Sequence, residues 1–135
     1  MEIIKKFIES ANAQIGTIKY KTVVTSAGHT LVADEPESND GEDSGMNPYS
    51  LLLASLGSCT AITLRMYVIR KMWVVEHISV KLELFRTATG ITIERYLSFK
   101  GELSAEQKNR LLQIANACPI HKILVGNIDI ETTLG

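Results

Sequence analysis

The sequence predicts an α+β fold in which an antiparallel sheet is wrapped around one long, buried central helix. The helix is indicated by residues 44–64, which carry no charge and include the helix-starting pair Asn47-Pro48. Segments in which apolar and polar residues alternate lie before and after this helix. Strands grouped in this way, without a regular strand–helix repeat, are typical of α+β folds and not of doubly wound ones. The length suits a single domain spanning residues 1–135.

The first third of the chain is predicted to form a helix, two strands and a loop. Apolar residues at helical spacing predict a short amphipathic helix over residues 2–12. Alternation predicts a strand over Thr17–Thr25 and, after a turn, a returning strand over His29–Ala33. Residues 34–45 then contain six acidic side chains and no basic one, which indicates a solvated acidic loop.

The long helix is predicted to run from Pro48 to about Lys71. Asn47 is a good N-cap, and proline suits the first helical position because its missing N–H has no partner there. The helix is apolar on most sides as far as Leu64, so we expect it to be buried nearly all round. Its serine and threonine content makes it a poor membrane span, and we expect no membrane partner.

The second half of the chain is predicted to supply the rest of the sheet. Ser104 and Gln107 have the spacing of a capping box, and Pro119 suits the start of a further short helix. The prediction is a strand over 78–84, a turn over 87–90 and a return strand over 91–99. A helix over 105–116, a short helix over 119–124 and a final strand over 128–134 follow.

Composition excludes several classes of function. The formal charge of −1 gives no reason to expect nucleic acid or an anionic membrane surface as a partner. Two cysteines cannot build a disulfide framework, and the N-terminus lacks the basic-then-apolar order of a signal peptide. We therefore expect a cytoplasmic protein, in which thiols stay reduced unless they have a chemical role.

The two cysteines are the first candidates for chemistry. Cys118 precedes a predicted helix N-terminus, where free N–H groups and the helix dipole favour a thiolate, and His121 lies one turn away. Cys59 lies in the long helix, on a face with the apolar residues Leu52, Leu56, Ile62 and Met66. The alternative for each cysteine is an inert core residue. Because 59 positions separate them, spacing alone does not show that they meet.

Arg95 is the candidate cation of the site. It has the apolar, inward parity of its strand, between Ile93 and Leu97, and an inward arginine needs a partner. A β-bulge that turns Arg95 to solvent is the alternative. Cys118 and His121 also form a C-x-x-H pair, but structural zinc sites usually have two close ligand pairs, so we expect no metal.

Two motifs resemble the OsmC/Ohr family of organic-hydroperoxide-reducing proteins. They are residues 47–60, with the sequence NPYSLLLASLGSCT, and residues 118–121, with the sequence CPIH. The resemblance implies an intertwined homodimer with active sites at the subunit interface. It implies that Cys59 is the peroxidatic thiol and Cys118 the resolving one, with no bound cofactor and an external dithiol as reductant. An apolar pocket beside Cys59 would favour organic hydroperoxides over hydrogen peroxide.

The chain departs from the family pattern at two places. Well-characterised peroxidases of the family have a glutamate just after the Asn-Pro pair, where this chain has Tyr49 and Ser50. They also hold the thiolate with an arginine from an N-terminal strand, whereas residues 1–46 contain no arginine. Three functions are therefore compatible with the sequence: a peroxidase supported by Arg95 and His121, a non-catalytic dimer that binds a small hydrophobic ligand, and a purely structural dimer.

Overall fold

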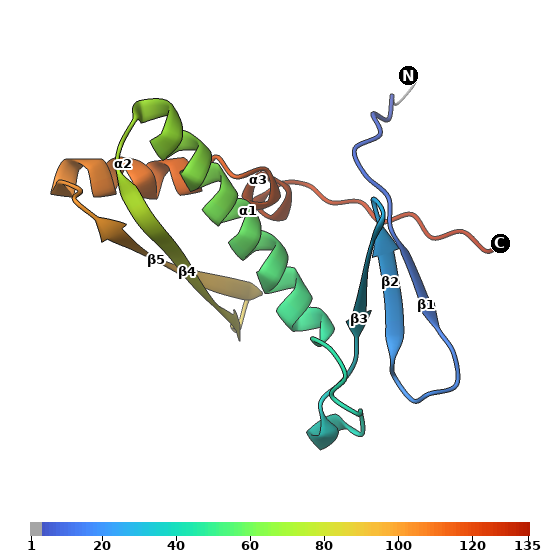
Figure 1. Cartoon of the computed structure of the whole chain (residues 1–135). Coiled ribbons are helices and arrows are strands. Elements are labelled where there is room, and N and C mark those ends of the chain that lie inside the picture. The colour runs from blue at the N-terminus through green and yellow to red at the C-terminus, as the bar shows by residue number, and fades with distance from the viewer. Residues whose placement is uncertain (1–3) are drawn as a thin grey trace. The chain divides into compact units, whose positions relative to one another are not determined.

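The computed structural model describes residues 4–135 and has the predicted α+β architecture, with antiparallel sheets and one long helix (Figure 1). The strands are β1 (Asn12–Ile15), β2 (Thr22–Ser26), β3 (His29–Ala33), β4 (Val75–Arg86) and β5 (Ile91–Gly101). The helices are η1 (Glu37–Asn39), α1 (Pro48–Lys71), α2 (Ala105–Ala115) and α3 (Pro119–Val125). The chain divides into two compact units, one ending at Leu51 and the other beginning at Leu52.

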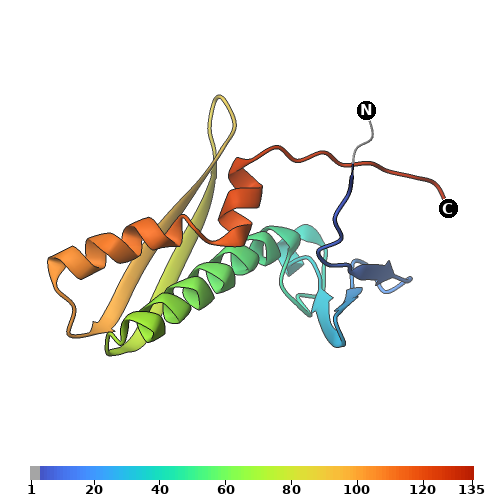
Figure 2. The same cartoon turned by 90° about the horizontal axis from the view of Figure 1, so that it is seen from above.

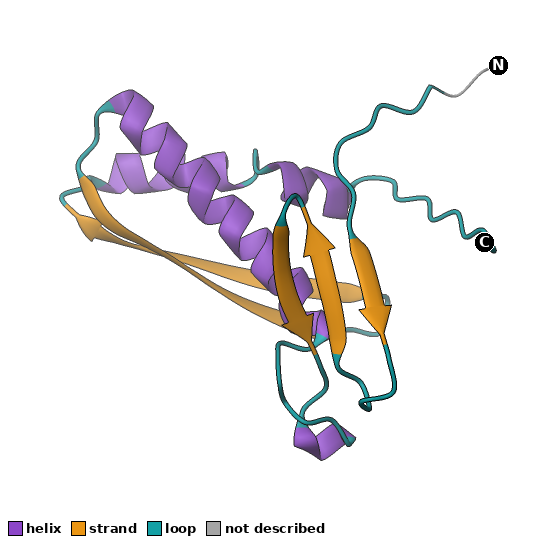
Figure 3. Cartoon of the chain, turned by 45° about the vertical axis from the view of Figure 1, so that its right-hand side comes forward, coloured by secondary structure: helices purple, strands orange, loops and turns teal. Residues whose placement is uncertain are grey.

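The first unit contains a three-stranded antiparallel sheet in the order β1–β2–β3 (Figure 3). The returning strand over His29–Ala33 is confirmed. The helix predicted over residues 2–12 is wrong for its described part, because residues 4–11 have no regular structure and β1 begins at Asn12. The apolar side chains in that segment are exposed, and a short helix without a surface to pack on is marginal in water.

The strand predicted over Thr17–Thr25 is only partly correct. Residues 16–21 connect two strands instead of extending one, and Lys19 adopts a positive φ of 39° within this turn. β2 begins at Thr22 and pairs with both neighbours, so that Val24 lies opposite Ala13 and Leu31. Alternation alone could not locate the turn, because the residues in it continue the period of two.

The acidic segment over residues 34–45 is folded around one buried carboxylate, that of Asp34. This carboxylate accepts hydrogen bonds from the Ser44 hydroxyl and from the backbone N–H groups of Glu35 and Ser44. The bond from the Ser44 hydroxyl is the largest cause that holds the pKa of Asp34 below its ordinary value. Gly45 is required here, since a Cβ would lie 1.9 Å from the Val32 carbonyl oxygen. One member of the acidic loop is therefore a structural anchor and not a solvated charge.

Helix α1 begins and ends as the sequence predicts. The Asn47 side chain accepts the Ser50 N–H at 2.9 Å, and the helix ends at Lys71 before Met72, whose φ is 57°. Within this chain only one side of α1 is buried, and Ile62 and Met66 on the other side are 55% and 65% exposed. Among the described residues α1 is the one helix long and apolar enough to cross a membrane, although its buried side belongs to the core.

In the second unit, α1 and α2 cover one face of the long β4–β5 hairpin (Figure 2). Gly57 allows the close approach of α1 to β4, because a Cβ there would lie 2.7 Å from the Leu82 side chain. The buried residues of this core share an apolar or aromatic character and come from α1, β4 and α2: Leu64, Tyr67, Val68, Val75, Leu111 and Ala115. The core fixes the positions of α1, β5 and α2, which carry the candidate site.

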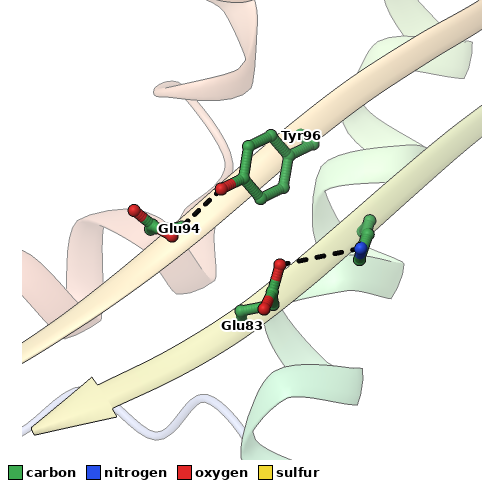
Figure 4. A network of polar contacts seen from close by, with 4 residues as sticks. Glu83, Glu94 and Tyr96 are labelled. Carbon is green, nitrogen blue, oxygen red and sulfur yellow. Dashed lines mark hydrogen bonds and ion pairs between the residues drawn. The ribbon is translucent and has the colours of Figure 1, made fainter.

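The other face of the hairpin is polar. Glu83 and Glu94 lie directly opposite each other on β4 and β5, which places two like charges side by side. The Tyr96 hydroxyl donates to Glu94 at 3.0 Å, and the Lys81 Nζ lies 3.6 Å from Oε1 of Glu83 (Figure 4). The bond to Glu94 is the main cause that raises the pKa of Tyr96. Since side chains alternate along a strand, the polar outer face leaves Arg95 on the inner one.

The C-terminal elements agree with the sequence up to residue 125. The capping box of α2 is present, with the Ser104 hydroxyl accepting from Gln107 N–H and the Gln107 side chain accepting from Ser104 N–H. Helix α3 begins at Pro119 as expected. The final strand predicted over residues 128–134 is wrong, because this segment has no regular structure. A strand needs a neighbour for its backbone N–H and C=O groups, and no described strand pairs with it.

Candidate active site

The fold brings the two cysteines into contact. Cys59 lies in the middle of α1 and is half-buried, whereas Cys118 is fully buried and is the N-cap residue of α3. Both are free thiols, and they lie close enough for each to shift the pKa of the other. Tertiary packing therefore supplies the meeting of the thiols that a separation of 59 positions left open.

The connection between α2 and α3 positions Cys118. The Asn116 N–H bonds to carbonyls of the last turn of α2, and the Cys118 N–H reaches the Ala115 carbonyl at 3.4 Å. Cys118 itself is extended, with φ −58° and ψ 128°, as expected for a residue before proline. This conformation turns the sulfur toward the start of α3, where the N–H groups of Ile120 and His121 interact with it.

The two thiols have opposite electrostatic environments. Burial raises the pKa of the Cys59 thiol, and the hydrogen bond with Cys118 raises it further. Burial also acts to raise the pKa of Cys118, but hydrogen bonds from Cys59, from the N–H groups of His121 and Ile120 and from Thr60 lower it overall. Of the two thiols, Cys118 is therefore the one whose surroundings favour the thiolate form.

Arg95 points inward, as its parity predicts, and pairs with Leu82 without a bulge at this position. Its Nη1 donates to the Thr60 hydroxyl at 3.2 Å, and its Nη2 donates to the Asn116 side-chain oxygen at 2.9 Å. The guanidinium thus links β5 both to α1 and to the segment that carries Cys118. It reaches the thiol pair through Thr60 and makes no direct bond to either sulfur among the hydrogen bonds of the described residues.

His121 lies in the first turn of α3, near both Cys118 and Arg95. Burial is the larger cause that lowers its pKa, and the positive charge of Arg95 lowers it further. His121 is therefore neutral at pH 7, and Arg95 is the permanent positive charge near the thiols. The sequence proposed both residues as supporting groups, and the structure brings both to the site.

An apolar cavity of about 420 Å³ lies beside the site. Arg95 and His121 supply its polar edge. Its remaining walls are aliphatic side chains from α1, β5 and α3: Leu52, Leu56, Ile91, Ile93, Leu124 and Val125. A cavity of this size and character suits a small organic molecule.

The four apolar residues proposed as a substrate pocket do not lie together. Leu52 and Leu56 line the cavity beside the thiols, whereas Ile62 and Met66 line a second, more open hollow of about 460 Å³ with Arg65 and His77. Leu56 and Ile62 are six positions apart, so at about 100° per residue they lie about 240° apart around the helix and face different sides.

The described residues contain no group of three His, Cys, Asp or Glu side chains close enough to hold a metal ion. Cys118 and His121 lie in one turn without a third ligand.

Two residues of the site were not identified from the sequence. Thr60 follows Cys59 directly and is fully buried, and Asn116 precedes Cys118 by two positions. A threonine in an apolar helix and an asparagine at a helix end both have ordinary structural roles, so neither gives a sequence signal. Their common link to Arg95 arises only from the packing of β5 against α1 and α2.

Comparison with known proteins identifies the family and the fold. The family model described as OsmC-like protein matches residues 41–133. No curated protein matches the sequence. A solved structure of a putative osmotic stress induced and detoxification response protein from Psychrobacter arcticus is similar, with a TM-score of 0.74 and 16% identity, covering 90% of this chain and 91% of that one.

Two further solved structures show the same fold. The OsmC-like protein from Mycoplasma pneumoniae has a TM-score of 0.71 and 18% identity, covering 92% of this chain and 90% of that one. An organic hydroperoxide resistance protein OsmC from Legionella pneumophila has a TM-score of 0.64 and 22% identity, covering 93% and 95%.

Proposed function

Because this chain belongs to the OsmC-like protein family, we propose that it is a thiol-dependent peroxidase that reduces organic hydroperoxides through Cys59 and Cys118. The contact between the two free thiols carries the proposal. It is supported by the neighbours of similar fold that are named organic hydroperoxide resistance proteins, such as those of Legionella pneumophila and Bacillus subtilis.

The first step is an attack by the Cys59 sulfur on the hydroperoxide. Cys59 is the half-buried member of the pair, whereas Cys118 is closed to solvent, so the peroxide reaches Cys59 more easily. The Cys118 thiolate accepts the Cys59 proton as the attack proceeds. The O–O bond breaks, one oxygen stays on Cys59 as a sulfenic acid, and the other leaves as an alcohol after it takes up a proton.

The second step forms a disulfide, and the third resets it. The Cys118 sulfur attacks the Cys59 sulfenic acid, an S–S bond forms and water leaves. An external dithiol then reduces the disulfide and is itself oxidised to a disulfide, which restores both thiols. One hydroperoxide and one dithiol are thus converted to one alcohol, one water and one oxidised dithiol.

The cavity beside the thiols supports an organic substrate. Its walls are mostly aliphatic, and they offer few hydrogen bonds to a small polar peroxide. Leu52 and Leu56 connect this cavity to the turn of α1 that precedes Cys59. The remaining part of the predicted pocket, Ile62 and Met66, lies at the other hollow and is assigned to subunit contact.

We infer that the working form is a cytoplasmic homodimer. Ile62, Met66 and Ile69 form an exposed apolar stripe on α1, and large exposed apolar surfaces mark interaction sites. A second copy that covers this stripe would complete the burial of the helix. Light scattering on the purified protein should give twice the chain mass of 14.9 kDa, and Met66→Glu should shift the mass to that of one chain. A wild-type protein that is monomeric at micromolar concentration would contradict the dimer.

Peroxide consumption with a dithiol tests the proposed function. With dithiothreitol as reductant, the protein should consume cumene hydroperoxide about tenfold faster than hydrogen peroxide, because the cavity buries the aromatic ring. Consumption of neither peroxide above the rate without protein would reject the proposal.

A second candidate function, a non-catalytic dimer that binds a small hydrophobic ligand, is favoured by the same cavity of about 420 Å³. It requires Cys59 to have no chemical role. A hydrophobic compound that co-purifies with the protein, together with a Cys59 thiol unreactive to hydroperoxide, would favour this second function.

A further inference from the structure

Thr60 stands between the Arg95 guanidinium and the Cys118 sulfur. Its side chain is fully buried and its hydroxyl meets three groups. It accepts a bond from Arg95 Nη1 at 3.2 Å and donates to the Leu56 carbonyl oxygen at 2.7 Å, and it lies close enough to Cys118 to lower the pKa of that thiol. A hydroxyl has one proton, so it can donate to the carbonyl or to the sulfur but not to both at once.

The negative charge on sulfur decides between these two acceptors. A hydrogen bond to an ionised group is about twice as strong as a neutral one, so a thiolate draws the Thr60 proton away from Leu56. The Leu56 carbonyl is not left without a partner, because it also accepts the helical N–H of Thr60. Arg95 occupies a lone pair of the same hydroxyl and polarises it, which strengthens its donation to the sulfur.

We propose that Thr60 and Arg95 are positioning residues that stabilise Cys118 as the thiolate leaving group when the Cys59–Cys118 disulfide is reduced. Asn116 holds the other end of the guanidinium and so fixes Arg95 against the segment that carries Cys118. This assignment rests on the redox cycle proposed above. It gives the chain a cation for the site from β5, although residues 1–46 contain no arginine.

The reduction step is balanced as follows. A thiolate of the external dithiol attacks the more accessible Cys59 sulfur, the S–S bond breaks, and its electron pair leaves on Cys118. The second thiolate of the dithiol then attacks the mixed disulfide and releases Cys59, which takes up a proton. Leaving is faster for a sulfur of lower pKa, so the groups around Cys118 control the rate of reset.

The titratable and charged groups near Cys118 come from three elements. Cys59 faces it from α1, Arg95 approaches through Thr60 from β5, and His121 lies on α3 with its pKa lowered by burial and by Arg95. Lys122 on α3 is exposed to solvent. Since His121 is neutral at pH 7, loss of the Thr60–Arg95 pair leaves Cys118 with backbone N–H groups and one neighbouring thiol as its donors.

The direct test titrates Cys118 alone. In a Cys59→Ser background, the ultraviolet absorbance of the thiolate is followed against pH for Thr60→Val, Thr60→Ser, Arg95→Met and Asn116→Ala. Thr60→Val and Arg95→Met should each raise the apparent pKa of Cys118 by about one unit, a tenfold smaller thiolate fraction below the pKa. Thr60→Ser, which retains the hydroxyl, should titrate within about 0.3 units of the parent.

A kinetic test uses the protein with both cysteines. The disulfide is formed with diamide, without any peroxide, and its reduction by dithiothreitol is followed at several pH values. Thr60→Val should reset about threefold more slowly than Thr60→Ser, as expected for a leaving thiol whose pKa is about one unit higher.

Asn116→Ala tests whether Arg95 acts on Cys118 through Thr60 or only holds β5 against the segment that carries Cys118. It removes one contact of Arg95 but leaves the bond to Thr60, so it should change the titration less than Arg95→Met. Equal titration of Thr60→Val and Thr60→Ser, or equal shifts in Asn116→Ala and Arg95→Met, would overturn the assignment. If Thr60→Val does not fold, the comparison of Asn116→Ala with Arg95→Met decides. If the protein leaves hydroperoxides intact but the variants show the predicted shifts in the pKa of Cys118, the peroxidase function is rejected. The stabilisation of the Cys118 thiolate by Thr60 and Arg95 is then retained.

Discussion

Cys59→Ser should reduce hydroperoxide consumption to the rate without protein, a loss of at least about 100-fold. The reason is that a hydroxyl at this position has no accessible anion at neutral pH, whereas the thiol can pass its proton to the neighbouring Cys118 sulfur. The measurement is the loss of cumene hydroperoxide with dithiothreitol under steady-state conditions.

Cys118→Ser is the matched control for the two roles. It should still reduce about one equivalent of hydroperoxide per active site, but more slowly, and then accumulate a sulfenic acid on Cys59 that a dimedone probe labels. If Cys118→Ser loses the first turnover and Cys59→Ser keeps it, the roles assigned to the two cysteines are reversed.

Leu111→Ala should lower the free energy of unfolding by about 2–5 kcal/mol. Leu111 is fully buried between α2 and α1, among Leu64, Val68 and Ala115, so its loss leaves a cavity in the core that holds the site together. Urea denaturation at one fixed protein concentration is the measurement, because the proposed dimer would make the apparent stability depend on concentration.

Leu112→Ala provides the control for this core prediction. Leu112 is the next residue of α2 but is 58% exposed, so the same truncation should change the free energy of unfolding by less than about 0.5 kcal/mol. Equal destabilisation by both variants would contradict the burial of Leu111 in one core.

The sequence predicted best those elements whose signals are local. Asn47-Pro48, the capping box at Ser104 and the proline at residue 119 each act through the backbone of their own helix, and all three helices begin where these residues indicate. The β4–β5 hairpin was also predicted, because both strands alternate over many residues and are joined by the turn at Thr87–Gly90.

Prediction failed where a segment needs a surface that lies outside its own sequence. The apolar residues of 4–11 and of 128–134 have the spacing of a helix and of a strand, but in this chain most of them are exposed and neither element forms. Periodicity reports which faces of a segment are apolar, and packing partners decide whether the element is stable.

For the candidate site, the sequence indicated which side chains could take part in chemistry, but it did not indicate which of them lie close together. The lowered pKa of the Cys118 thiol agrees with its predicted position at a helix N-terminus, and the inward direction of Arg95 followed from strand parity. The contact of Cys118 with Cys59 and the role of Thr60 depend on how α1, β5 and the α2–α3 connection pack. These contacts join residues 35 or more positions apart, and no local pattern encodes them.

The central claim, that Cys59 and Cys118 form one redox pair, is tested most directly by mass spectrometry after a single turnover. The reduced protein is mixed with one equivalent of cumene hydroperoxide per chain and digested without reductant. We predict a peptide pair joined by a Cys59–Cys118 disulfide within one chain, formed with the loss of two hydrogen atoms. Both cysteines recovered as free thiols while the hydroperoxide remains unreduced would contradict the account.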